Sequence, residues 1–234
     1  MDSAKIGEFH VWFDNLQEYR GLRREVFDNN TYYFETENPN PVIIDAGAHI
    51  GLSTLYFKKL YPGAIVMAIE PNPRSLQLLK MNVEINRLEN VQIVPVALVG
   101  GQSDAEEKVE YFQDKSEDKW YSTGGLLDKA WNRTQESEAI MVKAKRLDEL
   151  VDWPVDLLKM DIEGVEQEVL MSSPRTLKLV KRLIVEYHPV ERNTLVELAE
   201  FLKECGYEVV VYKNGEEVRI EWARGLVMIE AVKR

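Results

Sequence analysis

Short apolar segments alternate with helical segments from Pro41 onward, and this alternation constrains the fold more than any other feature of the sequence. Strand patterns lie at 42–45, 64–70, 91–98, 155–161 and 182–189, with helical patterns at 52–60, 73–88, 165–170 and 193–205. Parallel strands need a crossover connection between them, which is usually a helix. The order therefore predicts an α/β fold, in which a mostly parallel sheet carries helices on both faces.

The last part of the chain instead predicts antiparallel strands. Two strand patterns meet at Asn214-Gly215, and this dipeptide is the strongest short signal of a β-hairpin. A further strand is expected over 139–147, beside the main sheet. The polar stretch 100–125 is predicted to be a surface excursion, and long loops of this kind are often functional lids.

The first 40 residues precede a break at "NPNP" and mix aromatic with polar side chains. We expect one or two short helices there, followed by a strand at 31–35. The break divides the chain into an N-terminal segment, 1–40, that covers the functional site, and a domain over 41–234. Tyr32 and Tyr33 are candidates either for covering a ligand or for closing this segment onto the sheet.

Composition narrows the class of protein. The chain has 234 residues, of which 45% are hydrophobic and 29% charged, as in one globular domain with appendages. Its net charge of −11 disfavours a large nucleic-acid partner, because phosphate binding relies on Lys and Arg. The single cysteine, Cys205, excludes an internal disulfide. With no signal-peptide pattern and no apolar run near the roughly 18 residues that cross a bilayer, we expect a cytoplasmic protein.

The stretch "VIIDAGAHIGLSTLYF" places an acid, Asp45, at the tip of a strand and a small-residue loop directly behind it. Gly47 and Gly51 allow a tight turn and a close approach of the backbone to a ligand. The loop departs from G-x-G-x-x-G, because His49 replaces the glycine against which a pyrophosphate sits. A nucleoside without phosphates, such as S-adenosylmethionine, tolerates that replacement, and Asp45 is then expected near its amino-acid end or sulfonium.

Glu70 ends the next strand, where an acid accepts both hydroxyls of a ribose. Ligands of open parallel sheets bind beyond the carboxyl ends of the strands, so Asp45 and Glu70 are expected at one site. Two other interpretations stay open: an NAD-type oxidoreductase, and a tight strand-to-helix turn that binds nothing.

Several segments together resemble the FkbM-type family of class I S-adenosylmethionine-dependent methyltransferases. They are "VIIDAGAHIGLSTLYF", "AIEPNP", "NVQIVPVAL", "LDEL", "LLKMDIEGVEQEVL" and "IVEYHP", which together extend from about residue 32 to 189. The block "KMDIEGVEQEVL" is the most specific of them. His49 stands where the family often has Asn.

The resemblance implies a Rossmann-like domain with a seven-stranded, mostly parallel sheet whose last strand is antiparallel. It also implies a set of cofactor-binding residues. In that set Asp45, Gly47 and Gly51 line the methionine side and Glu70 holds the ribose. Asn72, Val96 and Ala97 lie near the adenine, and His49 and Ser53 complete the set.

A second group of polar residues follows later strands, and we expect catalysis there. The candidates are Asp161, Glu163, Glu186 and His188. With a hydroxyl acceptor, Asp161 or His188 is the expected general base, since histidine titrates near neutrality. Alternatively, the same four residues hold a divalent cation such as Mg²⁺. The structural alternatives are a helix-start acid for Glu163 and a strand-end histidine for His188.

The leading hypothesis is methylation of a hydroxyl on a small molecule or sugar, and a non-catalytic S-adenosylmethionine-binding module is a further alternative. Trp120 and Tyr121 either cap the acceptor or anchor their loop. An oligomer is compatible with the sequence, and nucleic-acid methylation is disfavoured by the charge.

Overall fold

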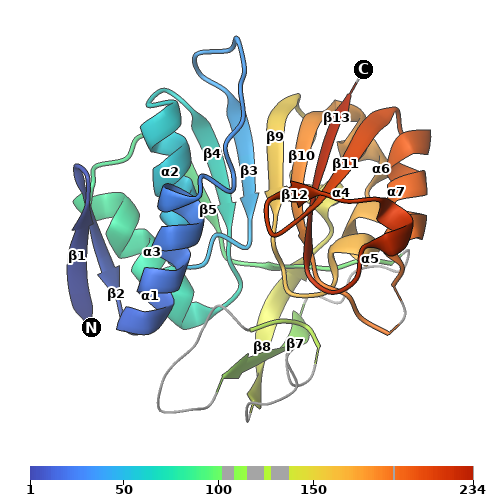
Figure 1. Cartoon of the computed structure of the whole chain (residues 1–234). Helices are drawn as coiled ribbons and strands as arrows, with labels where there is room; N and C mark the ends of the chain where they lie inside the picture. The colour runs from blue at the N-terminus through green and yellow to red at the C-terminus, as the bar shows by residue number, and fades with distance from the viewer. Residues whose placement is uncertain (102–107, 115–123, 128–136, 192, 234) are drawn as a thin grey trace.

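The computed structural model describes residues 1–101, 108–114, 124–127, 137–191 and 193–233. Its centre is an eight-stranded sheet in the order β12-β11-β13-β10-β9-β3-β4-β5 (Figure 1). The strands are β3 (Val42–Ala46), β4 (Ile65–Ile69), β5 (Val91–Val94), β9 (Val155–Met160), β10 (Val180–Tyr187), β11 (Tyr207–Lys213), β12 (Glu216–Glu217) and β13 (Val227–Lys233). The first five pair in parallel, whereas β13 pairs antiparallel with both β10 and β11. The predicted sheet, with its antiparallel last strand, is confirmed.

The predicted hairpin is also confirmed. Lys213 pairs with Glu216, which leaves Asn214 and Gly215 as the two turn residues. Both have positive φ angles, 53° and 81°, as a type I′ turn requires. The hairpin adds the two-residue strand β12 at the sheet edge, so the sheet has one strand more than the seven expected.

Helices cover both faces of the sheet. Neighbouring residues of a strand point to opposite faces, so each face carries apolar side chains that must be covered. Ile43 packs with α2 and the N-terminal segment, while Ile44 packs against the core under α5, α6 and α7. The helices are α1 (Leu16–Arg23), α2 (Leu52–Leu60), α3 (Pro73–Ile85), α4 (Leu147–Leu150), α5 (Glu166–Met171), α6 (Pro174–Leu179) and α7 (Leu195–Glu204). Among the described residues, no helix has the length and apolar character needed to cross a bilayer.

The N-terminal segment differs from its prediction. It opens with a hairpin of β1 (Asp2–Ile6) and β2 (Phe9–Phe13), followed by α1 and the π-helix η1 (Arg24–Asp28). The hairpin docks on α3, where Asn82 accepts the Trp12 N–H at 2.6 Å.

The strand predicted at 31–35 was wrong. Tyr32 and Phe34 alternate inward as a strand would, but no neighbouring strand pairs with them. They pack on Phe57 of α2 as aromatic anchors, while Tyr33 is exposed.

A small second sheet lies beyond the carboxyl edge of the main sheet (Figure 1). It contains β6 (Ala97–Leu98), β7 (Lys108–Asp114) and β8 (Ser137–Lys145), in the order β6-β8-β7. The strand predicted at 139–147 is β8, and part of the predicted excursion at 100–125 forms β7. Trp120 and Tyr121 lie outside the described residues.

Candidate active site

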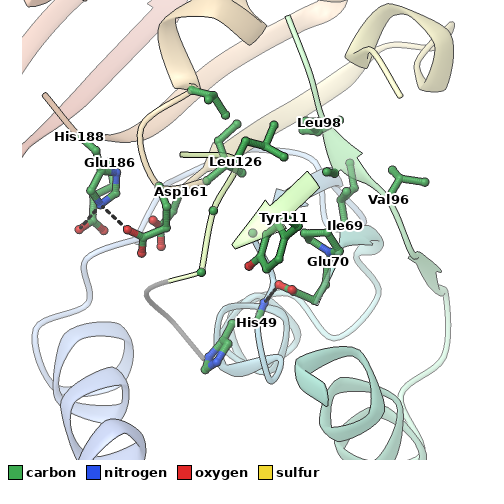
Figure 2. Close-up of a pocket in the computed structure, with 18 of the residues that line it drawn as sticks. His49, Ile69, Glu70, Val96, Leu98, Tyr111, Leu126, Asp161, Glu186 and His188 are labelled. Atoms are coloured by element: carbon green, nitrogen blue, oxygen red, sulfur yellow. Dashed lines mark hydrogen bonds and ion pairs between the residues drawn. The ribbon is translucent and has the colours of Figure 1, made fainter. Parts of the chain in front are cut away.

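A cavity of about 230 Å³ opens at the carboxyl ends of β3, β4 and β9. Figure 2 shows Glu70 and Val96 on one side of it and Asp161, Glu186 and His188 on the other. Its lining residues come from the N-terminal segment, the glycine loop, both sheets and the loops after β9 and β10: Leu22, Glu25, Gly47, His49, Ile69, Glu70, Pro71, Val96, Ala97, Leu98, Tyr111, Gly124, Gly125, Leu126, Asp161, Ile162, Glu163, Val165, Glu186 and His188.

The glycine loop fits closely between neighbouring elements. Gly47 has a φ of 76°, and a Cβ there would lie 1.7 Å from the backbone oxygen of Asp161. Gly51 has a φ of 93°, and its Cβ would lie 2.7 Å from Cδ1 of Leu79 on α3. Gly47 lines the cavity and Gly51 does not. Gly51 permits close packing of α3, and the cofactor contact expected for it stays a prediction.

Glu70 joins the glycine loop to the end of β4. Its carboxylate accepts the backbone N–H of His49 at 2.8 Å and of Asn72 at 2.7 Å. Burial raises the pKa of Glu70 to about 7, although both backbone donors oppose this shift. The side chain lines the cavity, as do His49 and Ala97, and the cofactor contacts expected for these residues stay predictions.

Asp45 lies beneath the cavity rather than in its lining. Its side chain is fully buried, and Oδ2 accepts the hydroxyls of Ser53 at 2.7 Å and Thr54 at 2.6 Å. Oδ1 lies 3.5 Å from Nζ of Lys159. Asp45 and Ser53 thus bind each other, and the cofactor contacts expected for them stay predictions.

Asn72 also has a structural role. Its side-chain oxygen accepts the N–H groups of Arg74 and Ser75, which makes Asn72 the N-cap of α3. It is fully buried and does not line the cavity, and its expected contact with adenine stays a prediction. Val96 and Ala97, at the start of β6, do line the cavity at this end.

Three of the four catalytic candidates converge at the opposite end. One ligand-type atom each of Asp161, Glu186 and His188 lies within 4.8 Å of the others. Glu163 lines the cavity beside them, with Oε2 at 3.6 Å from Nε2 of His188. Residues that follow the carboxyl ends of β9 and β10 therefore lie together, at the edge of the sheet where ligands of parallel sheets bind.

The environment of His188 opposes the expected role as a base. Nδ1 lies 2.9 Å from Oε1 of the fully buried Glu166. Burial alone lowers the pKa of His188, but Glu166 and nearby carboxylates raise it to about 10. These carboxylates favour the imidazolium form of the ring, which has no lone pair to accept a proton.

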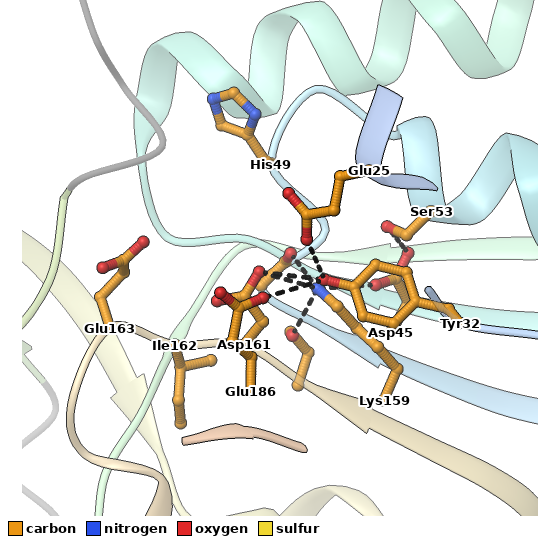
Figure 3. Close-up of polar contacts among 12 residues, drawn as sticks. Glu25, Tyr32, Asp45, His49, Ser53, Lys159, Asp161, Ile162, Glu163 and Glu186 are labelled. Carbon is orange, nitrogen blue, oxygen red and sulfur yellow. Dashed lines mark hydrogen bonds and ion pairs between the residues drawn. The ribbon is translucent and has the colours of Figure 1, made fainter. Parts of the chain in front are cut away.

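Glu25 and Tyr32 of the N-terminal segment lie against the cluster of catalytic candidates. The Tyr32 hydroxyl lies 3.3 Å from Glu25 and 3.4 Å from both Asp161 and Glu186. Figure 3 shows these contacts converging on the hydroxyl. Burial, together with the charges of Asp161 and Glu25, raises the pKa of Glu186, which favours the protonated form of its carboxyl.

Lys159 holds the glycine loop in place through hydrogen bonds to its backbone. Its ammonium group donates to the backbone oxygens of Gly47 at 2.7 Å and Ala46 at 3.2 Å. It also lies 3.7 Å from Asp161. Sequence reasoning missed Lys159 and Glu25. A lysine inside the apolar strand "VDLLKMD" was a usable signal, whereas Glu25 sits in no recognisable motif.

The sheet order, the glycine loop after β3 and the acid after β4 define a class I S-adenosylmethionine-dependent methyltransferase. The methyltransferase FkbM domain matches residues 45–209. The chain therefore belongs to the FkbM family of S-adenosylmethionine-dependent methyltransferases, and the NAD-type alternative is excluded.

Relatives with known names support this assignment. The chain is 30% identical to Methyltransferase 1 of Beauveria bassiana, over 65% of this chain and 66% of that protein. It is 28% identical to methyltransferase sdnD of Sordaria araneosa, over 88% and 86% of the two chains. It is 26% identical to the 2-O-methyltransferase NoeI of Sinorhizobium fredii, over 66% of each. The alignments thus span about two thirds of Methyltransferase 1 and NoeI.

Solved structures share the fold. Methyltransferase FkbM from Methylobacillus flagellatus is similar with a TM-score of 0.56 and 16% identity, over 90% of this chain and 47% of that chain. The fibrillarin pre-rRNA processing protein of Methanococcus jannaschii has a TM-score of 0.50 and 16% identity, over 99% and 82%.

Proposed function

We propose that the protein transfers a methyl group from S-adenosylmethionine to a hydroxyl oxygen of a small molecule or sugar. One observation carries the proposal: a single cavity has Glu70 at one end and the Asp161–Glu186–His188 cluster at the other. The printed activity of NoeI, a 2-O-methyltransferase, supports a hydroxyl acceptor. The N-terminal segment contributes Leu22 and Glu25 to the cavity, which supports its proposed role as a cover.

The cofactor is proposed to lie along the cavity. Its adenine contacts Val96 and Ala97, and its ribose hydroxyls donate to the Glu70 carboxylate. Its methionine part follows Gly47, where only a glycine leaves room. This direction brings the positively charged sulfonium toward Asp161, whose carboxylate attracts it.

Methyl transfer is an in-line displacement, so alignment of the acceptor and removal of its proton are the tasks of the protein. The acceptor oxygen forms a bond to the methyl carbon as the carbon–sulfur bond breaks, and the sulfur keeps the bonding electrons. We assign the proton to Asp161, because it lines the cavity and the raised pKa values of Glu186 and His188 favour the protonated forms of those two groups. Lys159 keeps the Asp161 carboxylate facing the cavity from 3.7 Å.

We expect Asp161→Asn to lower kcat by about 100- to 10,000-fold, the usual contribution of a general base. Binding of S-adenosylhomocysteine, which has no sulfonium charge, is expected to change little. Transfer of a tritiated methyl group to methyl glycosides and simple alcohols measures kcat, and calorimetry measures binding. Asp152→Asn is the matched control, since Asp152 is exposed and does not line the cavity. Unchanged turnover in Asp161→Asn would remove Asp161 as the base.

A divalent cation at Asp161, Glu186 and His188 is the alternative arrangement, and the distances among these residues suit one. Nδ1 of His188 faces Glu166 at 2.9 Å, and such a carboxylate is the usual partner of a histidine whose other ring nitrogen binds a metal. Nε2, which lies 3.6 Å from Glu163 and 3.9 Å from Glu186, is the nitrogen that would bind the ion. We propose the metal-free arrangement, because Lys159 already holds the Asp161 carboxylate from 3.7 Å.

Methyl transfer is accordingly expected to survive exhaustive chelation at pH 7. The measurement compares initial rates before treatment with EDTA, after dialysis, and after addition of Mg²⁺. A loss of activity that Mg²⁺ restores would establish the metal arrangement instead.

A further inference from the structure

A second cavity adjoins the first at the carboxyl edge of the sheet. The N-terminal segment forms one of its sides, and the β11–β12 turn with the start of β13 forms the other. The lining residues are Glu25, Asn29, Thr31, Glu186, Tyr212, Asn214, Gly215, Leu226, Val227, Met228 and Glu230. Strand register explains the meeting of these parts, because Met228 pairs with both Glu186 and Tyr212.

Glu25 and Glu186 line both cavities and so form the partition between them. The Tyr32 hydroxyl lies 3.3 Å from the first carboxyl group and 3.4 Å from the second. The Tyr32 hydroxyl, together with a hydrogen bond between Glu25 and Glu186, closes the partition in this structure. Asp161 lies directly behind it, 3.4 Å from the same hydroxyl. The second cavity therefore borders the end of the first where the methyl group is delivered.

The chemistry of the second cavity selects a class of ligand. The lining combines neutral hydrogen-bonding side chains and carboxyl groups with the apolar side chains of Leu226, Val227 and Met228, and a sugar ring likewise combines hydroxyl groups with apolar faces. Among the described lining residues no side chain is basic, so a phosphate or carboxylate on the ligand finds no counter-charge.

The positions in the chain of the residues that line the second cavity indicate which part of the protein selects the acceptor. Of all the lining residues, Glu186 alone lies within 45–209, the range that the FkbM domain matches. The others precede or follow that range. The family core thus supplies the cofactor end of the site, and the flanking parts of this chain shape the second cavity.

We propose that the second cavity is the acceptor site and takes the body of an uncharged or amine-bearing polyol of sugar type. Its target hydroxyl reaches the methyl group when the carboxyl groups of Glu25 and Glu186 separate and the acceptor displaces the Tyr32 hydroxyl from between them. The inference rests on the proposed O-methyl transfer and adds the place and chemical class of the acceptor.

The test fills the second cavity without touching the first. Leu226 is 36% exposed and lines only the second cavity, so Leu226→Trp is expected to raise KM for methyl glucoside by about tenfold or more. The dissociation constant of S-adenosylhomocysteine, measured by calorimetry, is expected to stay within about twofold of the wild-type value. Leu16→Trp makes the same change on α1, at a residue that is 44% exposed and lines neither cavity, and is expected to alter neither quantity.

A second experiment tests the class of ligand by comparing a neutral probe with a negatively charged one. The wild-type protein is expected to prefer methyl glucoside to its 6-carboxylate, the methyl glucuronide. Glu230→Lys is expected to shift the kcat/KM ratio of the two probes toward the carboxylate by about tenfold or more, since it supplies the missing counter-charge. An unchanged ratio would overturn the placement of the acceptor beside Glu230.

The outcomes separate this inference from the proposed function. Normal KM in a folded Leu226→Trp that binds S-adenosylhomocysteine would overturn the acceptor site and leave O-methyl transfer standing. Methylation of catechol or simple alcohols with none of the glycosides would also overturn the inference alone. A wild-type protein that binds S-adenosylhomocysteine but methylates no hydroxyl probe would overturn both.

Discussion

Gly47→Ala is expected to weaken binding of S-adenosylhomocysteine by about 100-fold or more. The added Cβ would lie 1.7 Å from the backbone oxygen of Asp161, and backbone atoms have no flexible side chain that can turn aside. The loop must then move away from β9 and lose the Lys159 contact to the Gly47 oxygen. Calorimetry with the purified variant measures the loss, and thermal unfolding reports the accompanying loss of stability.

Gly7→Ala is the matched control for this experiment. Gly7 also has a positive φ, 57°, but a Cβ there meets no atom within 4 Å. The left-handed conformation alone costs about 1–2 kcal/mol for a residue with a side chain. We therefore expect Gly7→Ala to lose a little stability and to bind normally. Equal binding by both variants would show that the cofactor does not follow the Gly47 loop.

Lys159→Met is expected to lower the free energy of unfolding by about 3–5 kcal/mol, the usual cost of removing one partner from a buried ion pair. The lysine side chain is 2% exposed and Asp45 is fully buried, so water cannot replace the missing charge. The backbone oxygens of Ala46 and Gly47 lose a donor as well. Urea unfolding followed by circular dichroism measures the change.

Two further variants separate charge from packing. Lys80→Met makes the same substitution at an exposed position of α3 and is expected to change stability by less than about 0.5 kcal/mol. Asp45→Asn combined with Lys159→Met is expected to recover part of the loss, because the amide carries no charge. A cost of Lys159→Met below about 1 kcal/mol would mean that the pair contributes little.

The sheet, and the position of Glu70 beside the glycine loop, were predictable because their signals are local. The strands β3, β4 and β9 are short apolar runs that end at or just before an acid, and the rule that ligands bind at the carboxyl ends of parallel strands places Glu70 beside the glycine loop. The turn at Asn214-Gly215 needed only two residues to be recognised. Patterns of this kind depend on neighbours in the sequence.

Roles that depend on distant partners were not predictable. Asp45 has the same strand-end position as Glu70, but the hydroxyls of the following helix and Lys159 bind its carboxylate. His188 looks like a base until Glu166 is seen against its ring. Tyr32 reaches Asp161 across 129 positions of the chain, and no spacing rule connects them.

The N-terminal hairpin was not predicted. Its two strands pair only with each other, so the alternation of strands and helices that predicts the main sheet does not include them. The second cavity shows the same limit, since its sides come from opposite ends of the described chain.

A ribosome makes β10 and β11 before β13, yet the folded sheet holds β13 between them and bonded to both. Until β13 emerges, each of the two earlier strands presents an unsatisfied edge to other nascent chains, which is a known route to aggregation. Glu186 acquires its neighbour Met228 only at that last insertion. The growing polypeptide therefore gains its reaction centre late, and a chaperone that shields the β10 edge during translation is expected to increase its yield.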